Sequence, residues 1–283
     1  MGGRNKSGQG VIRFSLGDLE DSRIDTLETR LAARPRHISP EEWEVRVALA
    51  ACYRLIAHFG WDDLILTHNS ARVPGEPKHF LINPMGLMFN EITASNLVKM
   101  DLEGNLVEPS EHEANRAGYV IHSAIYMGRP DVQCVIHTHT EADIAVGALE
   151  EGLLPLSQWA MRFYNRLGYH DYEGVSLDLD ERERLQQSIG NYPVLVLRNH
   201  GLLATGRNVA EAFSLTYHFE RSAEAQLKIM AAVAAGAKIV APSAETCERQ
   251  AALFAGNEPR LQGQREWPAL LRLADKLDPS YRS

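Results

Sequence analysis

The segment Val135-Ile136-His137-Thr138-His139-Thr140 begins as an apolar run and ends in two histidines that are one residue apart. A β-strand points alternate side chains to the same face, so we expect His137 and His139 to project together. Two neutral imidazoles on one face can ligate a divalent transition metal. The segment therefore predicts a strand that ends at a metal site.

A second apolar run, Val194–Leu197, leads into Arg198-Asn199-His200-Gly201. This run predicts another strand, with His200 at its end. Three histidines that leave one coordination position open are typical of catalytic metal sites, because substrate or water must reach the ion. The sequence thus predicts a metal site formed by His137, His139 and His200.

The bulk composition is that of an ordinary globular protein. The chain has 283 residues, of which 45% are hydrophobic and 23% charged, and its net charge is −8. No basic excess indicates a nucleic-acid partner, and no apolar run is long enough to cross a bilayer. The first ten residues lack an apolar signal core, and Cys52, Cys134 and Cys247 show no metal-type spacing. We therefore expect a cytoplasmic protein without a membrane partner.

Local patterns predict the elements that precede the histidine strand. A helix begins after Ser39, which is a good N-cap with Glu42 at the capping-box position, and it ends near Gly60. Residues 64–67 and 79–82 predict two strands that a turn at Pro74-Gly75 joins into a hairpin. Residues 93–97 predict a short helix, followed by a strand that ends at Asp101.

The remaining patterns predict helices and a domain organisation. The helices are expected over residues 114–126, 141–149, 208–235 and 266–277. We expect three regions: a flexible N-terminal arm over 1–36, a main domain over 37–255, and a C-terminal tail with a short helix over 256–283. The mixture of strands and helices predicts one sheet between helical layers.

With these elements in place, the chain resembles the class II aldolase/adducin family over about residues 39–255. The motifs that carry the resemblance are Arg129-Pro130-Asp131 ahead of His137-Thr138-His139, and Asn199-His200-Gly201 before the long helix. The likeness is nearest to the adducin head-domain branch, through the runs 118–126, 152–155 and 169–172.

The resemblance implies a three-layer α/β/α sandwich around a central, largely antiparallel sheet. It also implies a Zn²⁺-type site at His137, His139 and His200, and a homotetramer whose sites lie at subunit interfaces. In the sugar-phosphate aldolases of the family, the metal polarises a carbonyl group. A glutamate on the helix before the histidine strand moves the proton.

The chain departs from the aldolase pattern at that glutamate. Gly118 occupies its position, and a glycine cannot shuttle a proton. The residues that would bind phosphate are also replaced, by Arg116, Ala117, His68, and Met85 ahead of Gly86. The sequence therefore argues against a standard sugar-phosphate aldolase.

Other residues are candidates for the missing roles. Arg116 can pair bidentately with a carboxylate, and the alternative is an arginine on a helix surface. With His68 and Gly86 it forms the predicted substrate-binding set. The predicted proton-transfer residues are Glu113, His170 and Tyr172. The alternative for Glu113 is a place in a solvated loop. The alternative for His170 and Tyr172 is a polar cluster whose members hydrogen-bond to one another.

We therefore predict a metal-dependent lyase that cleaves a C–C bond of a small hydroxy or oxo acid or a sugar-like substrate, by decarboxylation or retro-aldol cleavage. Zn²⁺ is the expected ion, with Mn²⁺, Fe²⁺ and Co²⁺ left open. One alternative is an iron-dependent oxygenase on the same scaffold. Another is a non-catalytic, adducin-like cytoskeletal scaffold protein that binds actin, although the tail from Glu266 lacks the basic block of adducins.

Overall fold

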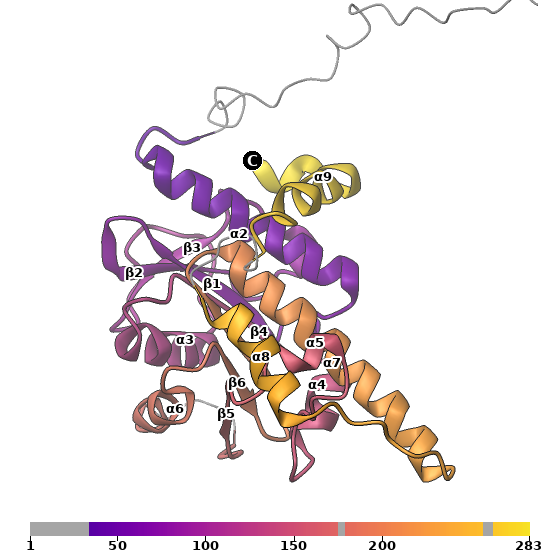
Figure 1. Cartoon of the computed structure of the whole chain (residues 1–283). Coiled ribbons are helices and arrows are strands. Elements are labelled where there is room, and N and C mark those ends of the chain that lie inside the picture. Colours follow the sequence, from indigo (N-terminus) through magenta and orange to yellow (C-terminus); the bar gives the residue numbers. More distant parts are fainter. Residues whose placement is uncertain (1–33, 175–178, 257–262) are drawn as a thin grey trace, which may run out of the picture. The chain divides into compact units, whose positions relative to one another are not determined.

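Seven β-strands cross the part of the chain that the computed structural model describes, which is residues 34–174, 179–256 and 263–283 (Figure 1). In chain order they are β1 His68–Val73, β2 Glu76–Ile82, β3 Val98–Asp101, β4 Cys134–Thr138, β5 Leu167–His170, β6 Val194–Leu197 and β7 Gly201–Gly206. They form one sheet in the order β3-β2-β1-β4-β7-β6-β5, in which only β5 and β6 pair in parallel. The predicted, largely antiparallel sheet is confirmed.

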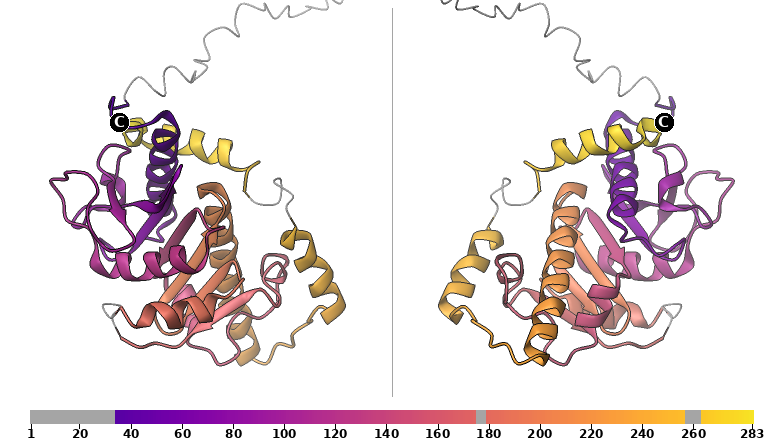
Figure 2. Two further views of the ribbon diagram at one scale, coloured as in Figure 1. Left: turned by 90° about the vertical axis from the view of Figure 1, so that its left-hand side faces the viewer. Right: turned by 90° about the vertical axis from the view of Figure 1, so that its right-hand side faces the viewer.

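Helices cover both faces of this sheet, as the two views in Figure 2 show. They are α2 Pro40–Phe59, α3 Arg116–Gly128, α4 Glu141–Gly147, α5 Gln158–Met161, α6 Glu181–Ile189, α7 Val209–Ala234, α8 Ala244–Ala255 and α9 Trp267–Leu277. Helices α3 and α6 share one apolar core with the sheet, and α4 and α7 share another. The predicted three-layer α/β/α sandwich is therefore confirmed.

Strand β6 is apolar at every position, without the alternating polar residues of a strand that has one exposed face. Leu195 and Leu197 belong to the core beneath α3 and α6, whereas Val194 and Val196 belong to the core beneath α4 and α7. All four side chains are buried because the strand is covered on both faces. The strand therefore holds its end, and the turn to β7, in a fixed place.

Helix α2 begins and ends where its sequence predicts. The Ser39 hydroxyl accepts a hydrogen bond from the Glu42 amide at 3.1 Å, and Gly60 closes the helix with φ 70°. The Glu42 carboxylate does not complete a capping box. It accepts hydrogen bonds from Arg46 and Lys99, at 2.8 and 3.1 Å, in a buried ion network.

Two predicted elements are wrong. Residues 64–67 form a turn instead of a strand, because Leu64 has φ 50°, and the Leu64 and Leu66 side chains are exposed. The strand begins only at His68, one residue after burial begins at Thr67. Residues 93–97 do not form a helix either, since the helical turn in this region is η2, Phe89–Glu91.

The C-terminal residues pack against α2. Asp278 bonds Arg54 at 2.7 Å, and the 3-10 turn η4, Pro279–Arg282, buries the Tyr281 ring completely. The predicted domain boundaries stay predictions, and most of the predicted arm lies outside the described residues. Within the described residues, no helix is both long enough and apolar enough to cross a bilayer.

Candidate metal centre

Three strands bring the predicted ligands to one place. Strand β4 pairs with β7 on one side and with β1 on the other, where His137 lies opposite His68. Strands β6 and β7 form a tight hairpin, in which Asn199 has φ 58° and the His200 amide donates to the Leu197 carbonyl. A Cβ atom at Gly201 would lie 2.2 Å from the Thr138 carbonyl oxygen, so only glycine lets β7 approach the end of β4 this closely.

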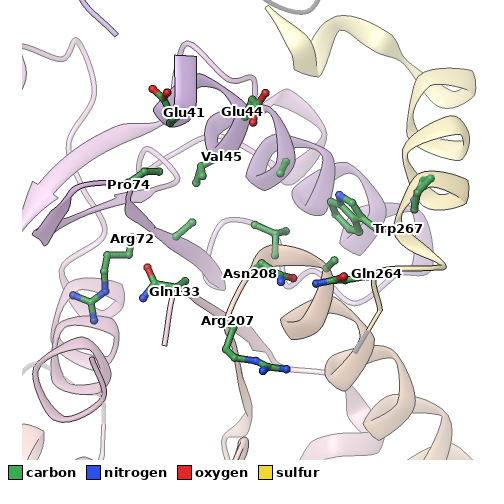
Figure 3. Close-up of a pocket in the computed structure, with 15 residues that line it drawn as sticks. Glu41, Glu44, Val45, Arg72, Pro74, Gln133, Arg207, Asn208, Gln264 and Trp267 are labelled. Carbon is green, nitrogen blue, oxygen red and sulfur yellow. The ribbon is translucent and has the colours of Figure 1, made fainter. Parts of the chain in front are cut away.

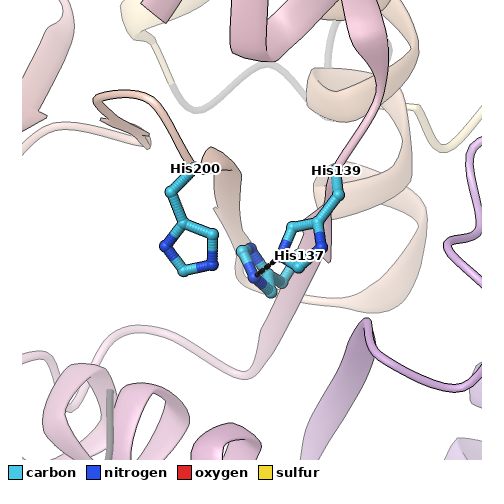
Figure 4. Close-up of side chains that lie close together, drawn as sticks. All are labelled: His137, His139 and His200. Carbon is cyan, nitrogen blue, oxygen red and sulfur yellow. Dashed lines mark hydrogen bonds between the residues drawn. The ribbon is translucent and has the colours of Figure 1, made fainter. Parts of the chain in front are cut away.

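The rings of His137, His139 and His200 converge as predicted (Figure 4). One nitrogen of each ring lies within 4.8 Å of the corresponding nitrogens of the others. The ring centroids of His139 and His200 lie 4.6 and 4.9 Å from that of His137. His139 is one residue beyond the end of β4, so the pair spans the strand end and does not lie wholly within the strand.

The hydrogen bonds of the first two rings fix their tautomers. His137 Nδ1 bonds the Leu202 carbonyl at 2.8 Å, and His139 Nδ1 bonds the Asp63 carboxylate at 3.0 Å. Both partners are acceptors, so each Nδ1 carries a hydrogen and each Nε2 is left for a further partner. The two Nε2 atoms lie 2.8 Å apart, within hydrogen-bonding distance of each other (Figure 4). When both rings are neutral, each Nε2 presents a lone pair, and one cation can accept both, as in a metal site.

Burial keeps the His137 and His200 imidazoles neutral. The pKa of His137 lies well below its usual range because of burial and the neighbouring rings of His68, His139 and His200. Burial, together with His139 and His170, lowers the pKa of His200 to about 4. Neutral imidazoles at physiological pH are the form that binds a metal.

Helix α7 supports the ligand segment from behind. The Thr138 hydroxyl, between the two histidines, contacts Asp143 and Glu220 at 2.8 and 3.1 Å, and the Thr140 hydroxyl donates to Glu220 at 2.6 Å. Burial raises the pKa of Glu220 to about 7, and burial together with Glu220 raises the pKa of Asp143. The two acids therefore form a buried carboxyl pair behind the histidine ligands.

The three histidines open into a cavity of about 570 Å³. Seven of the nine predicted site residues line it: His68, Glu113, Arg116, His137, His139, Tyr172 and His200. The Tyr172 ring lies 6.1 Å from that of His200, and the His68 ring lies 4.8 Å from that of His137. The structure thus brings most of the predicted metal, substrate and proton-transfer residues around one space.

The other two predicted residues do not line this cavity. His170 is buried, where its Nδ1 contacts the Ser188 hydroxyl at 3.0 Å and its Nε2 lies 3.6 Å from Glu181. Gly86 lies in an exposed turn with φ 93°, and its neighbour Met85 contributes to the cavity instead. Their predicted catalytic and substrate-binding roles stay predictions that the geometry does not favour.

Arg116 contributes a cation to the lining of this cavity. It is the first residue of α3, whose free amide groups carry partial positive charge, and Asn115 caps that helix through Gly118 at 3.1 Å. The Arg116 guanidinium is exposed and forms no hydrogen bond or ion pair with any residue that the structure describes. It is therefore available to an anion that enters the cavity.

Sequence reasoning missed Asp63, which orients His139. Nothing in the local pattern marks it, because it directly precedes the run 64–67 that was predicted to be a strand. Sequence reasoning also missed Asp143 and Glu220, which lie far apart in the chain and meet behind Thr138.

A larger cavity of about 680 Å³ lies elsewhere, between the first turns of α2 and α7 and the start of α9 (Figure 3). Its lining includes Glu41, Glu44, Val45 and Trp267, but no histidine or cysteine. Size alone therefore does not identify the site, and the convergence of nitrogen ligands favours the smaller cavity.

The chain is similar to proteins of one family over most of its length. The family model described as class II aldolase and adducin N-terminal domain matches residues 47–227. The crystal structure of an aldolase II superfamily protein from Pseudomonas syringae is 48% identical and superposes with a TM-score of 0.82, covering 87% of this chain and 98% of that one.

Two further relatives represent the two halves of the family name. Alpha-adducin of Rattus norvegicus is 39% identical over 84% of this chain, but the match spans only 34% of the adducin. An L-fuculose 1-phosphate aldolase from Glaciozyma antarctica is 25% identical with a TM-score of 0.75, covering 86% of this chain and 94% of the enzyme.

Proposed function

Since the chain belongs to the class II aldolase and adducin family, we propose that it is a metal-dependent lyase that cleaves a C–C bond of a small hydroxy or oxo acid, or of a sugar-like substrate carrying a carboxylate. One observation carries the proposal. Three converging histidines line the same cavity as the Arg116 guanidinium, which has no ion-pair partner among the residues that the structure describes. The site thus offers ligands for a divalent cation and, beside them, a cation for a substrate carboxylate.

The donor set fits a divalent transition metal. His137 and His139 present two lone pairs to one point, and His200 completes three imidazole donors. A bound ion would polarise the substrate oxygen atoms and stabilise the negative charge that develops when the C–C bond breaks. We propose Zn²⁺, because three histidines with an open position are common at catalytic zinc sites, and Mn²⁺, Fe²⁺ and Co²⁺ fit the same donors.

Arg116 supports an acid as the substrate. A guanidinium donates two parallel hydrogen bonds to a carboxylate, and the N-terminus of α3 adds further positive potential beside it. The lining also includes the apolar side chains of Leu66, Met85 and Ile121, as is usual for a small-molecule site. We propose that Arg116 holds the substrate carboxylate that does not react.

Gly118 supports a reaction without an enzyme carboxylate at the position of the family's glutamate. In a decarboxylation the bond to the carboxyl carbon breaks, carbon dioxide leaves, and the electron pair stays on the adjacent carbon, from which it delocalises onto the oxygen of a carbonyl group attached to that carbon. The carbon then needs one proton. Tyr172 and Glu113 line the cavity and are the proposed donors, because both are exposed to the space where substrate would lie.

We also propose a homotetramer in the cytoplasm. The outer end of α7 and the residues that follow it expose Val233, Ile239 and Val240, a surface that a second subunit would cover. The three cysteines are free and buried, which suits a reducing compartment. Light scattering of the purified chain and fractionation of cells test the two statements separately.

The adducin similarity supports a second candidate, a non-catalytic scaffold that binds actin. The 39% identity to alpha-adducin favours it, although the match covers about a third of that protein. The third candidate, an iron-dependent oxygenase, uses the same histidines with Fe²⁺. The three candidates differ in whether a product forms and in whether oxygen is consumed.

One experiment separates them. The full chain is purified, its metal content is measured, and it is incubated with a panel of 2-hydroxy and 2-oxo acids and sugar acids, with and without oxygen. We expect about one divalent ion per chain and release of carbon dioxide or an aldehyde without oxygen consumption. Oxygen consumption would indicate the oxygenase instead, and saturable sedimentation with actin filaments without turnover would indicate the scaffold.

A further inference from the structure

Four buried side chains form a hydrogen-bonded chain that begins at the wall of the metal cavity. They are His68 and Ser70 of β1, two residues apart, and His122 and Tyr126 of α3, four residues apart. These spacings place each pair on one face of its element, so the two pairs meet between strand and helix. We call these four residues the His68–Tyr126 chain.

Each joint of the chain is a hydrogen bond. His68 Nδ1 lies 2.9 Å from His122 Nε2, and the Tyr126 hydroxyl lies 2.8 Å from the Ser70 hydroxyl. The Ser70 hydroxyl also contacts His122 Nδ1. All four side chains are buried, so none of these groups has water as an alternative partner.

The direction of these bonds follows from the last member. Ser70 is the only partner of the Tyr126 hydroxyl among the described residues, and burial raises the pKa of Tyr126, so the phenol keeps its hydrogen. A buried hydroxyl hydrogen without an acceptor is unfavourable, so Tyr126 donates to Ser70. Ser70 then donates to His122 Nδ1, and His122 Nε2–H donates to His68 Nδ1.

The consequence appears at the cavity. His68 accepts a hydrogen bond at Nδ1, so its own ring hydrogen lies on Nε2. His68 lines the cavity, and its Nε2 has no hydrogen-bond partner among the described residues. Because Nδ1 accepts and carries no hydrogen, the ring is neutral.

Gly118 makes room for this ring. A Cβ atom at position 118 would lie 2.9 Å from both Cγ and Cδ2 of His68, closer than real Cβ contacts allow. Any side chain at position 118, a glutamate included, would therefore displace the His68 ring. The absence of the family's glutamate and the placement of His68 are thus two parts of one structural change.

We propose that the His68–Tyr126 chain fixes His68 as a neutral donor whose Nε2–H binds a substrate oxygen beside the metal. The inference rests on the proposed function and assigns a group to it. A donor in this position stabilises negative charge on the oxygen as the C–C bond breaks, and it neither ligates the metal nor removes a proton. Where the family's aldolases have a glutamate that accepts a proton, this chain thus has His68, a hydrogen-bond donor that keeps its proton. Ser70, His122 and Tyr126 are positioning residues.

The direct test is the tautomer of His68. Long-range proton–nitrogen correlation spectra of the full chain, with labelled histidine and bound Zn²⁺, distinguish ring nitrogens that carry hydrogen from those that do not. We expect His68 to be neutral with its hydrogen on Nε2. A bare or zinc-bound Nε2 overturns the proposal. The spectra need no substrate, so the result does not depend on whether turnover is found.

The matched variants are Tyr126→Phe and Tyr119→Phe. Both remove a phenol hydroxyl from α3, but the Tyr119 hydroxyl donates to the Leu102 carbonyl and is not part of the chain. Only Tyr126→Phe should add the other tautomer to the His68 spectrum and lower kcat about tenfold or more with little change in KM. Thermal melting curves should show that both variants are folded. Equal His68 spectra for the two folded variants would refute the proposed direction of the hydrogen bonds in the His68–Tyr126 chain.

Failure of this inference and failure of the proposed function remain distinct. A protein that binds no metal and turns over no acid, but shows His68 with hydrogen on Nε2, refutes the lyase and leaves the hydrogen-bonded chain intact. A protein that releases carbon dioxide, but shows a bare His68 Nε2, keeps the lyase and refutes the donor role.

Discussion

The metal cavity has two walls that relate differently to the family pattern. The metal wall consists of His137, His139 and His200, at the meeting of β4 and β7, and matches the ligand set that the resemblance implies. The anion wall consists of His68, Arg116 and Gly118, from β1 and the start of α3, and departs from the aldolase pattern at each of these positions. One side of the cavity thus keeps its chemistry while the other changes it.

This difference separates the residues that serve the reaction from those that select the substrate. A metal that stabilises charge on oxygen serves cleavage of many acids and sugars, so its ligands need no change when the substrate changes. The groups that hold the substrate's anion and handle its proton must match each substrate. In the proposed lyase, the anion wall is therefore the part that selects the substrate.

The largest expected effect comes from removing a ligand of the metal wall. His137→Ala should abolish metal binding, because His137 is the most buried of the three and its ring is held by the Leu202 carbonyl. Turnover of any substrate found should fall by about three orders of magnitude or more, since the ion supplies several kcal/mol to the transition state. Metal analysis and initial rates measure both effects. His58→Ala, an exposed histidine away from the cavity, is the control, and a metal-replete His137→Ala protein would contradict the assignment.

The anion wall is tested by Arg116→Met. Loss of the guanidinium should raise KM for acids by about 10- to 100-fold, because a charged hydrogen bond contributes about 1.5–3 kcal/mol. Metal content should not change, and Arg116→Lys should fall between the two because it keeps the charge without the bidentate geometry. Steady-state kinetics decide, with the exposed Arg272→Met as the control. An unchanged KM would mean that the carboxylate binds elsewhere.

Asp63→Asn changes the support of the metal wall without touching the ion. Asp63 accepts the Nδ1 hydrogen of His139 at 3.0 Å, which fixes the tautomer that leaves Nε2 free. Metal affinity should fall about tenfold, at the lower end for such supporting carboxylates because Asp63 is partly exposed. Competition with a zinc chelator measures the change. The neighbouring Asp62→Asn should leave the affinity unchanged, and equal effects of the two variants would remove Asp63 from the site.

Much of the metal wall was predictable from the sequence, because its ligands are adjacent to strand patterns. His137 and His139 follow an apolar run, and His200 follows another, so the strand ends mark the site. The sheet, the β1–β2 hairpin, and the caps of α2 and α7 were predictable for the same reason, since each rests on local chemistry at Ser39, Gly75 or Asn208.

The parts that were missed depend on contacts between distant residues. Helix α6 has a largely charged sequence whose only buried apolar anchors are Leu185 and Ile189, so its pattern is weak. The run at 64–67 is apolar but exposed, and only its backbone shows that it is a turn. The His68–Tyr126 chain joins β1 to α3 over about 50 residues, which no local pattern reveals.

The smallest effect on metal binding and turnover is expected from a change in the buried carboxyl pair, Asp143 and Glu220, behind the metal wall. Burial raises the pKa of Glu220 from 4.5 to about 7, so the folded protein holds a proton there that the unfolded chain releases. Stability contributed by this proton is complete below about pH 4.5 and is lost as the pH rises towards 7. The buried histidines, whose pKa values are lowered, contribute in the opposite direction, so the wild-type curve alone does not show the effect.

Glu220→Gln isolates the contribution of this proton to stability, because glutamine cannot ionise and still contacts the Thr138 and Thr140 hydroxyls. The unfolding free energy of the variant, relative to that of the wild type, should rise between pH 4.5 and 7. The rise is at most about 3 kcal/mol, since one pKa unit corresponds to about 1.4 kcal/mol. It is smaller if Asp143 holds part of the proton. Urea unfolding across this pH range measures it. Glu224→Gln, one turn further along α7 and paired with Arg221, should show no such slope. A difference that stays flat with pH would mean that Glu220 is ionised in the folded protein, and that the metal wall is supported by a charge rather than by a shared proton.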